Sequence, residues 1–160
     1  MIDLTPELER LITEHPFFQD MEGDLRKTMV ECATLRIYAA GEYIHRHGDA
    51  ADRFYLIRHG SVAQELPVPD QEPIVIQTLH AGDILGWSWL VPPYHWTTDV
   101  RAMQLTRAVS LDARCLRGKY ENDPLLAYEL FKRFIPVIAS RLEAARLQLI
   151  NIYGEPHRRR

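Results

Sequence analysis

Cysteine is scarce in this sequence. Only Cys32 and Cys115 occur among its 160 residues, and they stand far apart. A structural metal site or a disulfide scaffold would need more of them, so we expect two reduced, buried thiols. Long apolar runs are also missing. No stretch approaches the roughly 18–20 residues that span a membrane, and the N-terminus does not resemble a signal peptide. We therefore expect a cytoplasmic protein with no membrane partner.

A surplus of charge of one sign is absent as well. The chain carries 19 Lys and Arg residues against 22 Asp and Glu residues, which gives a net charge of −3. Proteins bind nucleic acids through concentrated positive charge, and this chain has no overall excess of it. DNA and RNA are therefore not expected as partners.

The motifs of common enzyme classes are missing too. The chain contains no Gly-x-Ser-x-Gly, no Gly-Lys-Ser/Thr phosphate loop, no Cys-x-x-Cys and no His-Glu-x-x-His. We expect no catalysis, no metal and no cofactor. A less favoured alternative is a cupin-like metal site, because His45 and His47 would share one face of a strand and could hold a metal with Asp52 as the third ligand. No later histidine follows at the cupin spacing, so two solvent-facing histidines on a turn are the simpler interpretation.

The residues that are present predict one folded domain of the α+β class. Thr5 is a plausible N-cap before Pro6, and the pair His15-Pro16 would end that short helix. After residue 34, short apolar or alternating runs are separated by Gly, Asp and Pro at intervals of roughly 8–12 residues, which is typical of an antiparallel jelly roll. We predict N-terminal helices over 1–34, a jelly roll (double-stranded β-helix) over 35–111, C-terminal helices over 112–153 and a tail over 154–160.

The long C-terminal helix has the strongest periodic pattern in the chain. Asn122 or Asp123 would cap it, with Pro124 in its first turn. Its apolar residues alternate spacings of four and three, like the seam of a coiled coil. This seam consists of Phe131, Ile135, Ile138, Leu142, Ala145, Leu149 and Ile152. We predict a homodimer in which two copies pair through it.

The alternative is that the seam covers one face of the β block within a single chain. Leu130, Phe134 and Val137 widen the apolar stripe at its start, so that the first turns would lie on the roll while the later turns stay free to pair. Pro136 lacks a backbone donor and could bend the helix where these two roles divide.

Two segments carry a family resemblance. Residues 41–62, GEYIHRHGDAADRFYLIRHGSV, resemble the glycine-spaced signature of cyclic-nucleotide-binding domains, and residues 79–86, LHAGDILG, resemble the lead-in to that family's phosphate-binding cassette. The resemblance covers most of residues 15–153. It implies a jelly roll followed by a dimerising helix, as in the sensory half of catabolite-activator-type bacterial regulators. Such regulators continue into a helix-turn-helix domain, whereas this chain ends about where that domain would begin. We therefore expect that this chain does not itself recognise DNA.

The resemblance breaks at the two charged anchors of the cassette. In the family's nucleotide-binding members, a glutamate after the lead-in holds the ribose hydroxyl, and a later arginine pairs with the cyclic phosphate. Trp87 and Trp96 stand at these positions here. A hydrogen bond to a charged group contributes roughly 1.5–3 kcal/mol, so losing both weakens binding by about two to four decades. We expect no tight binding of cyclic AMP or cyclic GMP.

The cassette still predicts a regulatory, ligand-sensing role. Indoles could line a pocket for a flat apolar or cationic small molecule of unknown identity, or they could fill it and leave a structural or adaptor dimer. A third interpretation is that the aromatic patch faces a protein partner. A short helix opening at Gly86 would leave room for weak anion binding, which Asp99 opposes. The candidate ligand site comprises Ile84, Leu85, Gly86, Trp87, Ser88, Trp89, Trp96, Thr97 and Thr98.

Overall fold

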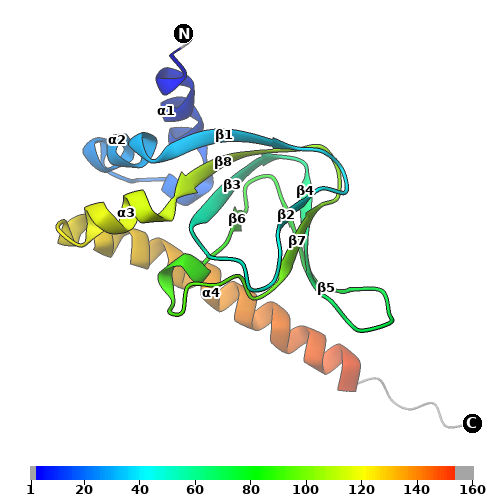
Figure 1. The fold of residues 1–160 in the computed structure, drawn as a ribbon. Helices are drawn as coiled ribbons and strands as arrows, with labels where there is room; N and C mark the ends of the chain where they lie inside the picture. Colours follow the sequence, from blue (N-terminus) through cyan, green and yellow to red (C-terminus); the bar gives the residue numbers. More distant parts are fainter. Residues whose placement is uncertain (1–2, 154–160) are drawn as a thin grey trace, which may run out of the picture.

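Short helices, a β roll and one long helix follow one another along the chain (Figure 1). The computed structural model describes residues 3–153. The helices are α1 Thr5–Glu14, η1 Pro16–Phe18, α2 Gly23–Glu31, η2 Ser88–Leu90, α3 Ala113–Tyr120 and α4 Pro124–Tyr153. The strands are β1 Ala33–Tyr38, β2 Tyr43–His45, β3 Arg53–His59, β4 Ser61–Leu66, β5 Ile74–His80, β6 Ile84–Leu85, β7 Asp99–Ala102 and β8 Thr106–Asp112. The helices α1, α2 and α3 gather at one end of the roll, and α4 runs along it.

The strands form two four-stranded sheets, ordered β1-β8-β3-β6 and β2-β7-β4-β5. Neighbouring strands pair antiparallel in both sheets. This is the predicted antiparallel roll, and its strands run from Ala33 to Asp112 rather than over 35–111. Gly60 joins β3 to β4 with a φ of 93°. A Cβ atom there would collide with the backbone carbonyl of Leu105, so glycine alone fits this turn.

The first helix begins and ends close to the predicted points. The cap residue of α1 is Leu4, and the N–H of Thr5 donates to the Asp3 carboxylate at 2.9 Å. Thr5 as N-cap was therefore wrong, because Asp3 supplies the oxygen and the helix already includes Thr5. The predicted end at His15 is confirmed: the chain turns there, and the Phe17 N–H donates to Nδ1 of His15 at 3.2 Å.

An aromatic cluster joins the helices to the first sheet. The ring of Phe54 on β3 stacks on Trp89 with centroids 5.0 Å apart, and Phe134 of α4 meets Phe54 edge to face at 5.0 Å. Phe17 completes the cluster against Phe134 at 4.9 Å. Phe54, Trp89 and Phe134 are fully buried. Such aromatic contacts supply much of the energy of a core, so this cluster fixes the start of α4 on the roll.

The long helix is capped and anchored as its sequence suggested. Oδ1 of Asp123 accepts the Leu126 N–H at 3.2 Å, which confirms Asp123 as the capping residue. Leu126, Leu130 and Phe134 are fully buried, and Val137 is half-buried, so the first turns lie on the roll as predicted. Within residues 3–153, no helix combines the length and the apolar character needed to cross a membrane.

The two cysteines form a disulfide, with their Cα atoms 5.7 Å apart and a separation of 83 positions in the sequence. The prediction of reduced thiols was wrong. Cys32 directly precedes β1, and Cys115 lies in the first turn after β8. Because Ala33 pairs with Leu111 in the antiparallel register of β1 and β8, the two cysteines meet at the same end of the sheet. Their separation in sequence contains no sign of this pairing.

Candidate functional site

The segment that resembles the cassette, residues 84–98, begins with β6 and leads to β7. It is here named the cassette segment. Ile84 and Leu85 form β6 and are buried. Gly86 has a φ of 99°, and the following helix, η2, spans only Ser88–Leu90 with Trp87 as its cap. The prediction of a helix opening at Gly86 was therefore wrong, since the helix starts later and makes a single turn.

The indole of Trp96 occupies the space next to Gly86. A Cβ atom on Gly86 would lie 2.7 Å from Cη2 of Trp96, so the ring packs directly on the glycine backbone. Trp96 is only 3% exposed. Its backbone N–H donates to the Asp49 carbonyl at 2.8 Å, and its carbonyl accepts the Gly48 N–H at 2.8 Å. The glycine-spaced loop therefore holds this tryptophan in place over the cassette backbone.

His45 lies against the other face of this indole. The two rings stack with centroids 4.3 Å apart and an interplanar angle of 16°. Nε2 of His45 is 2.7 Å from the hydroxyl of Tyr55. Burial lowers the pKa of His45 to about 4, which leaves the ring neutral at pH 7, and burial also raises the pKa of Tyr55. The prediction of a solvent-facing residue is wrong for His45, because Trp96 covers it, whereas His47 is exposed.

The other tryptophans have different environments. Trp89 is fully buried in the aromatic cluster, and its carbonyl accepts a hydrogen bond from Arg117 at 2.8 Å. Trp87 is half-buried and packs against the core. Of the remaining members of the predicted ligand site, Ser88 is buried, Thr98 half-buried and Thr97 exposed. The structure thus brings Gly86 and Trp96 together but sends Trp89 to the helix side.

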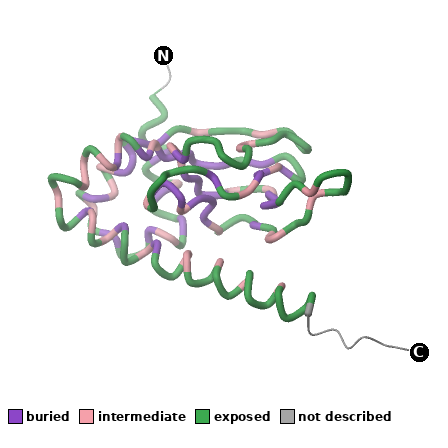
Figure 2. The backbone as a smooth tube through the Cα atoms, turned by 60° about the horizontal axis from the view of Figure 1, so that its bottom comes forward, coloured by how far each residue is buried: buried purple, intermediate pink, exposed green. Residues whose placement is uncertain are grey.

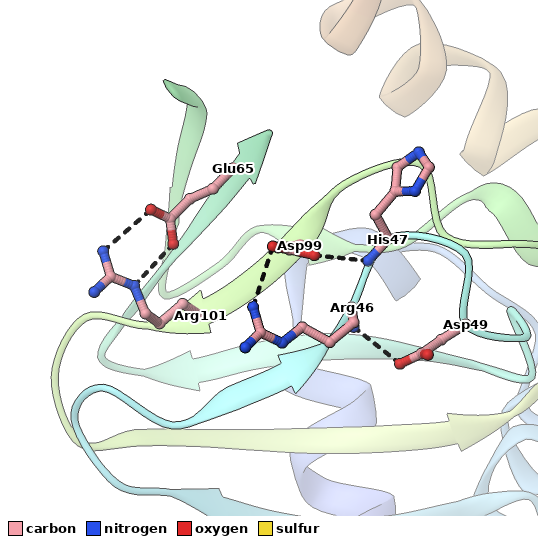
Figure 3. Close-up of polar contacts among 6 residues, drawn as sticks. All are labelled: Arg46, His47, Asp49, Glu65, Asp99 and Arg101. Carbon is pink, nitrogen blue, oxygen red and sulfur yellow. Dashed lines mark hydrogen bonds and ion pairs between the residues drawn. The ribbon is translucent and has the colours of Figure 1, made fainter. Parts of the chain in front are cut away.

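Two arginines near the cassette segment already form ion pairs with carboxylates (Figure 3). The buried Asp99 accepts the backbone N–H of His47 at 2.7 Å and the Arg46 guanidinium at 3.3 Å. Arg101 makes two hydrogen bonds to Glu65, at 2.8 and 3.1 Å. Within residues 3–153, no group of three or more His, Cys, Asp and Glu side chains is placed to hold a metal ion. Arg46 and Arg101 are therefore each already paired with a carboxylate of β7 or β4.

The predicted seam of α4 faces away from the roll. Its members Phe131, Ile135, Leu142, Ala145, Leu149 and Ile152 are exposed, and Ile138 is half-buried. Figure 2 shows the second half of the helix mostly exposed. The alternative that this seam covers the β block was wrong, because a different stripe of α4 meets the roll.

The sequence matches the model of a known family. The family model described as "Cyclic nucleotide-binding domain" matches residues 35–123, which is more than half of the chain. The chain belongs to the cyclic nucleotide-binding domain family. The predicted resemblance is thereby confirmed, and so is the regulatory, ligand-binding character of the fold at the level of the family.

Relatives of this cyclic nucleotide-binding domain come from kinases and transcriptional regulators. The cGMP-dependent protein kinase, isozyme 1, of Drosophila melanogaster is 32% identical over 90 residues, which cover 55% of this chain and 12% of the kinase. The CRP-like cAMP-activated global transcriptional regulator of Mycobacterium tuberculosis is 21% identical over 145 residues, 91% of this chain and 63% of the regulator. A solved structure from Geobacter metallireducens matches with a TM-score of 0.74 and 25% identity, covering 89% of this chain and 99% of that one. The chain thus spans less than two thirds of these two curated relatives.

Sequence reasoning missed two residues of this cyclic nucleotide-binding domain near Trp96: His45, which stacks on it, and Tyr55, which contacts His45. Tyr55 could have been placed inside the roll from the apolar alternation of its strand, but His45 reads as a turn residue. Its contact with Trp96 joins residues 51 positions apart, as their numbers show, and no local pattern marks that contact.

Proposed function

We propose that this protein is a non-catalytic regulatory domain that acts as a homodimer and does not bind cyclic AMP or cyclic GMP tightly. The observation that carries the proposal is the position of Trp96, which packs on Gly86 and is almost fully buried. A cyclic phosphate at the Gly86 backbone would have to displace this indole. The two positions at which the resemblance implies charged anchors offer it tryptophans instead.

Two costs act together against nucleotide binding. The absent anchors remove about two to four decades of affinity, from two charge-assisted hydrogen bonds. Moving a large apolar side chain out of the interior costs roughly a further 1.5–3 kcal/mol, or about one to two decades. Micromolar binding of a cyclic nucleotide would fall to the millimolar range or weaker.

Calorimetric titration with cyclic AMP and cyclic GMP tests this proposal. We expect no saturable heat for the natural sequence in the micromolar range. The variant Trp87→Glu/Trp96→Arg should gain affinity for at least one of the two nucleotides, because it supplies both anchors. Trp96→Ala is the matched control that opens the space without adding charge, and it should gain less. Micromolar binding by the natural sequence would contradict the proposal.

The homodimer is supported by the exposed seam of α4. Ile135 is 64% exposed and Ile152 65% exposed, although both are large apolar residues. A continuous apolar stripe of this kind on a soluble helix marks an interaction surface, and its alternating spacing suits a second copy of itself. In such a dimer, movement of α4 would report the state of the roll to a protein partner.

Sedimentation equilibrium distinguishes the dimer from a monomer. Leu142→Glu should convert the dimer into a monomer, because it places a charge in the middle of the seam. Ser140→Glu adds the same charge on an exposed position outside the seam and should leave the dimer intact. A monomeric natural protein, or equal behaviour of the two variants, would refute pairing through α4.

A second candidate function is sensing of a flat small molecule that displaces Trp96. The specific observation in its favour is Nε1 of Trp96, which is buried without a hydrogen-bond partner among the described residues. A buried donor without an acceptor costs roughly 1–3 kcal/mol, which a ligand could recover by moving the ring. A saturable change of tryptophan fluorescence across a metabolite panel, lost in Trp96→Phe, would support the sensor. A stable dimer with no response would support the adaptor with a filled pocket.

A further inference from the structure

A pocket lies between α1 and the sheet strands β1, β8 and β3, away from the cassette segment. Its volume is about 550 Å³. Four arginines line it: Arg10 from α1, Arg36 from β1, Arg58 from β3 and Arg107 from β8. We propose that this arginine pocket binds an organic phosphate of the size of a mononucleotide. None of its lining residues belongs to the cassette segment, so the proposal is independent of the function proposed above.

The arginines of the pocket have spare hydrogen-bonding capacity. Within residues 3–153, neither Arg36 nor Arg107 forms an ion pair with a carboxylate, and both are exposed. Arg58 reaches Glu14 only at 3.6 Å, which is too long for a good hydrogen bond. Arg10 also contacts Glu14, at 3.3 Å. One carboxylate is therefore shared by two guanidinium groups, and the other two guanidinium groups are left to a ligand.

The sheet register places Arg107 on the middle one of the three strands that line the pocket. Arg107 stands opposite Ile37 on β1 and opposite His59 on β3. Arg36 stands opposite Ala108, so strand alternation places it on the other face of the sheet from Arg107, on the edge strand that borders the pocket. Arginines from α1 and from three adjacent strands thus border one pocket, whose lining includes one acidic residue, Glu7, although the protein as a whole has a net charge of −3. Local concentration of cations in a concave site attracts anions more strongly than the net charge suggests.

The shape and lining of the pocket favour a phosphate joined to a ring over a free ion. Guanidinium groups bind phosphate oxygens in a bidentate geometry, and several of them can share one phosphate. Leu11 and Leu35 add an apolar wall. A volume of this size falls within the roughly 300–1,000 Å³ of typical small-molecule sites and exceeds the needs of inorganic phosphate. A sugar phosphate or a mononucleotide meets both demands.

Calorimetric titration of the full chain tests the arginine pocket, with AMP and ribose 5-phosphate as probes. We expect saturable binding of at least one of them, weaker binding of inorganic phosphate and none of adenosine, which lacks the phosphate. The variant Arg36→Gln/Arg107→Gln should weaken the binding at least tenfold. Raising the salt concentration should also weaken it, because the contacts are ionic.

A matched control removes the same charge elsewhere. Arg114 and Arg146 are exposed and lie outside the pocket, so Arg114→Gln/Arg146→Gln should bind the probes like the natural protein. Thermal unfolding verifies that both double variants fold. The proposal is overturned if neither AMP nor ribose 5-phosphate binds, if adenosine binds as well as AMP, or if both double variants bind alike.

Discussion

The first half of α4 packs into the core through apolar side chains, whereas its second half is held on the roll by polar ones. Leu126, Leu130 and Phe134 are fully buried. Further along, Arg141 donates to the Ile84 carbonyl at 2.6 Å, and Gln148 donates to the Ile76 carbonyl at 2.7 Å. Burial of several large apolar side chains is worth more than a few partly buried hydrogen bonds, so the second half is the part of the helix that can shift.

The cassette segment contacts the second half of α4 directly. Arg141 binds the backbone of Ile84, which lies two residues before Gly86. A structural change around Trp96 would therefore reach the second half of the helix first. That half also carries Leu142, Leu149 and Ile152 of the exposed seam.

The largest expected effect comes from breaking the apolar half. Phe134→Ala should lower the free energy of unfolding by about 3–5 kcal/mol, because it removes a fully buried ring from the aromatic cluster. Leu147→Ala changes an exposed residue of the other half and should cost no more than about 0.5 kcal/mol. Urea denaturation measures both values. Similar losses in the two variants would remove the distinction between the halves.

The disulfide strengthens the same end of the molecule. Cys32→Ser/Cys115→Ser should cost about 2–4 kcal/mol, since the bridge closes a loop of 83 residues and ties α3 to the end of α2. A reducing agent should lower the melting temperature of the natural protein and leave that of the double variant unchanged. Because disulfides are rare in the cytosol, thiol labelling in intact cells would also test the predicted cytoplasmic location. An unaltered melting temperature on reduction would contradict a stabilising bridge.

The polar half should respond more weakly and more locally. Arg141→Met removes a charge-assisted hydrogen bond and should cost about 1.5–3 kcal/mol at most. Amide hydrogen exchange should accelerate in the turns after residue 141 and stay slow around Phe134. Gln148→Ala should act in the same direction with about 1 kcal/mol. Faster exchange along the whole helix would show that the two halves move as one unit.

A pH titration should produce a gradual effect inside the roll. Burial lowers the pKa of His45 to about 4, so between pH 6.5 and 4 the unfolded chain binds a proton that the folded chain does not. Stability should therefore fall as the pH falls through this window. His15, whose pKa burial also lowers to about 4, should contribute in the same direction. His45→Gln should reduce the slope of stability against pH, which urea denaturation at several pH values measures; an unchanged slope would contradict the prediction.

Much of the fold followed from local patterns. The strands Ser61–Leu66 and Ile74–His80 coincide closely with alternating apolar runs between turn residues. Asp123 was recognisable as a cap because capping needs only a short side chain and the next turn of backbone. The candidate site was located in the sequence by its glycines, but whether its tryptophans line or fill the space was not. That depends on which ring faces Gly86, and the spacing of Trp87, Trp89 and Trp96 does not indicate which ring this is.

The sequence alone determined the family, the order of helices and roll, and the apolar seam of α4. These are properties of residue types and of their local spacing. Only the tertiary structure decided that Trp96 packs on Gly86 beneath His45, that Cys32 meets Cys115, and that four arginines line one pocket beside α1. Each of these contacts joins residues that are distant along the chain. Their proximity arises from strand register and helix packing, which no single segment encodes.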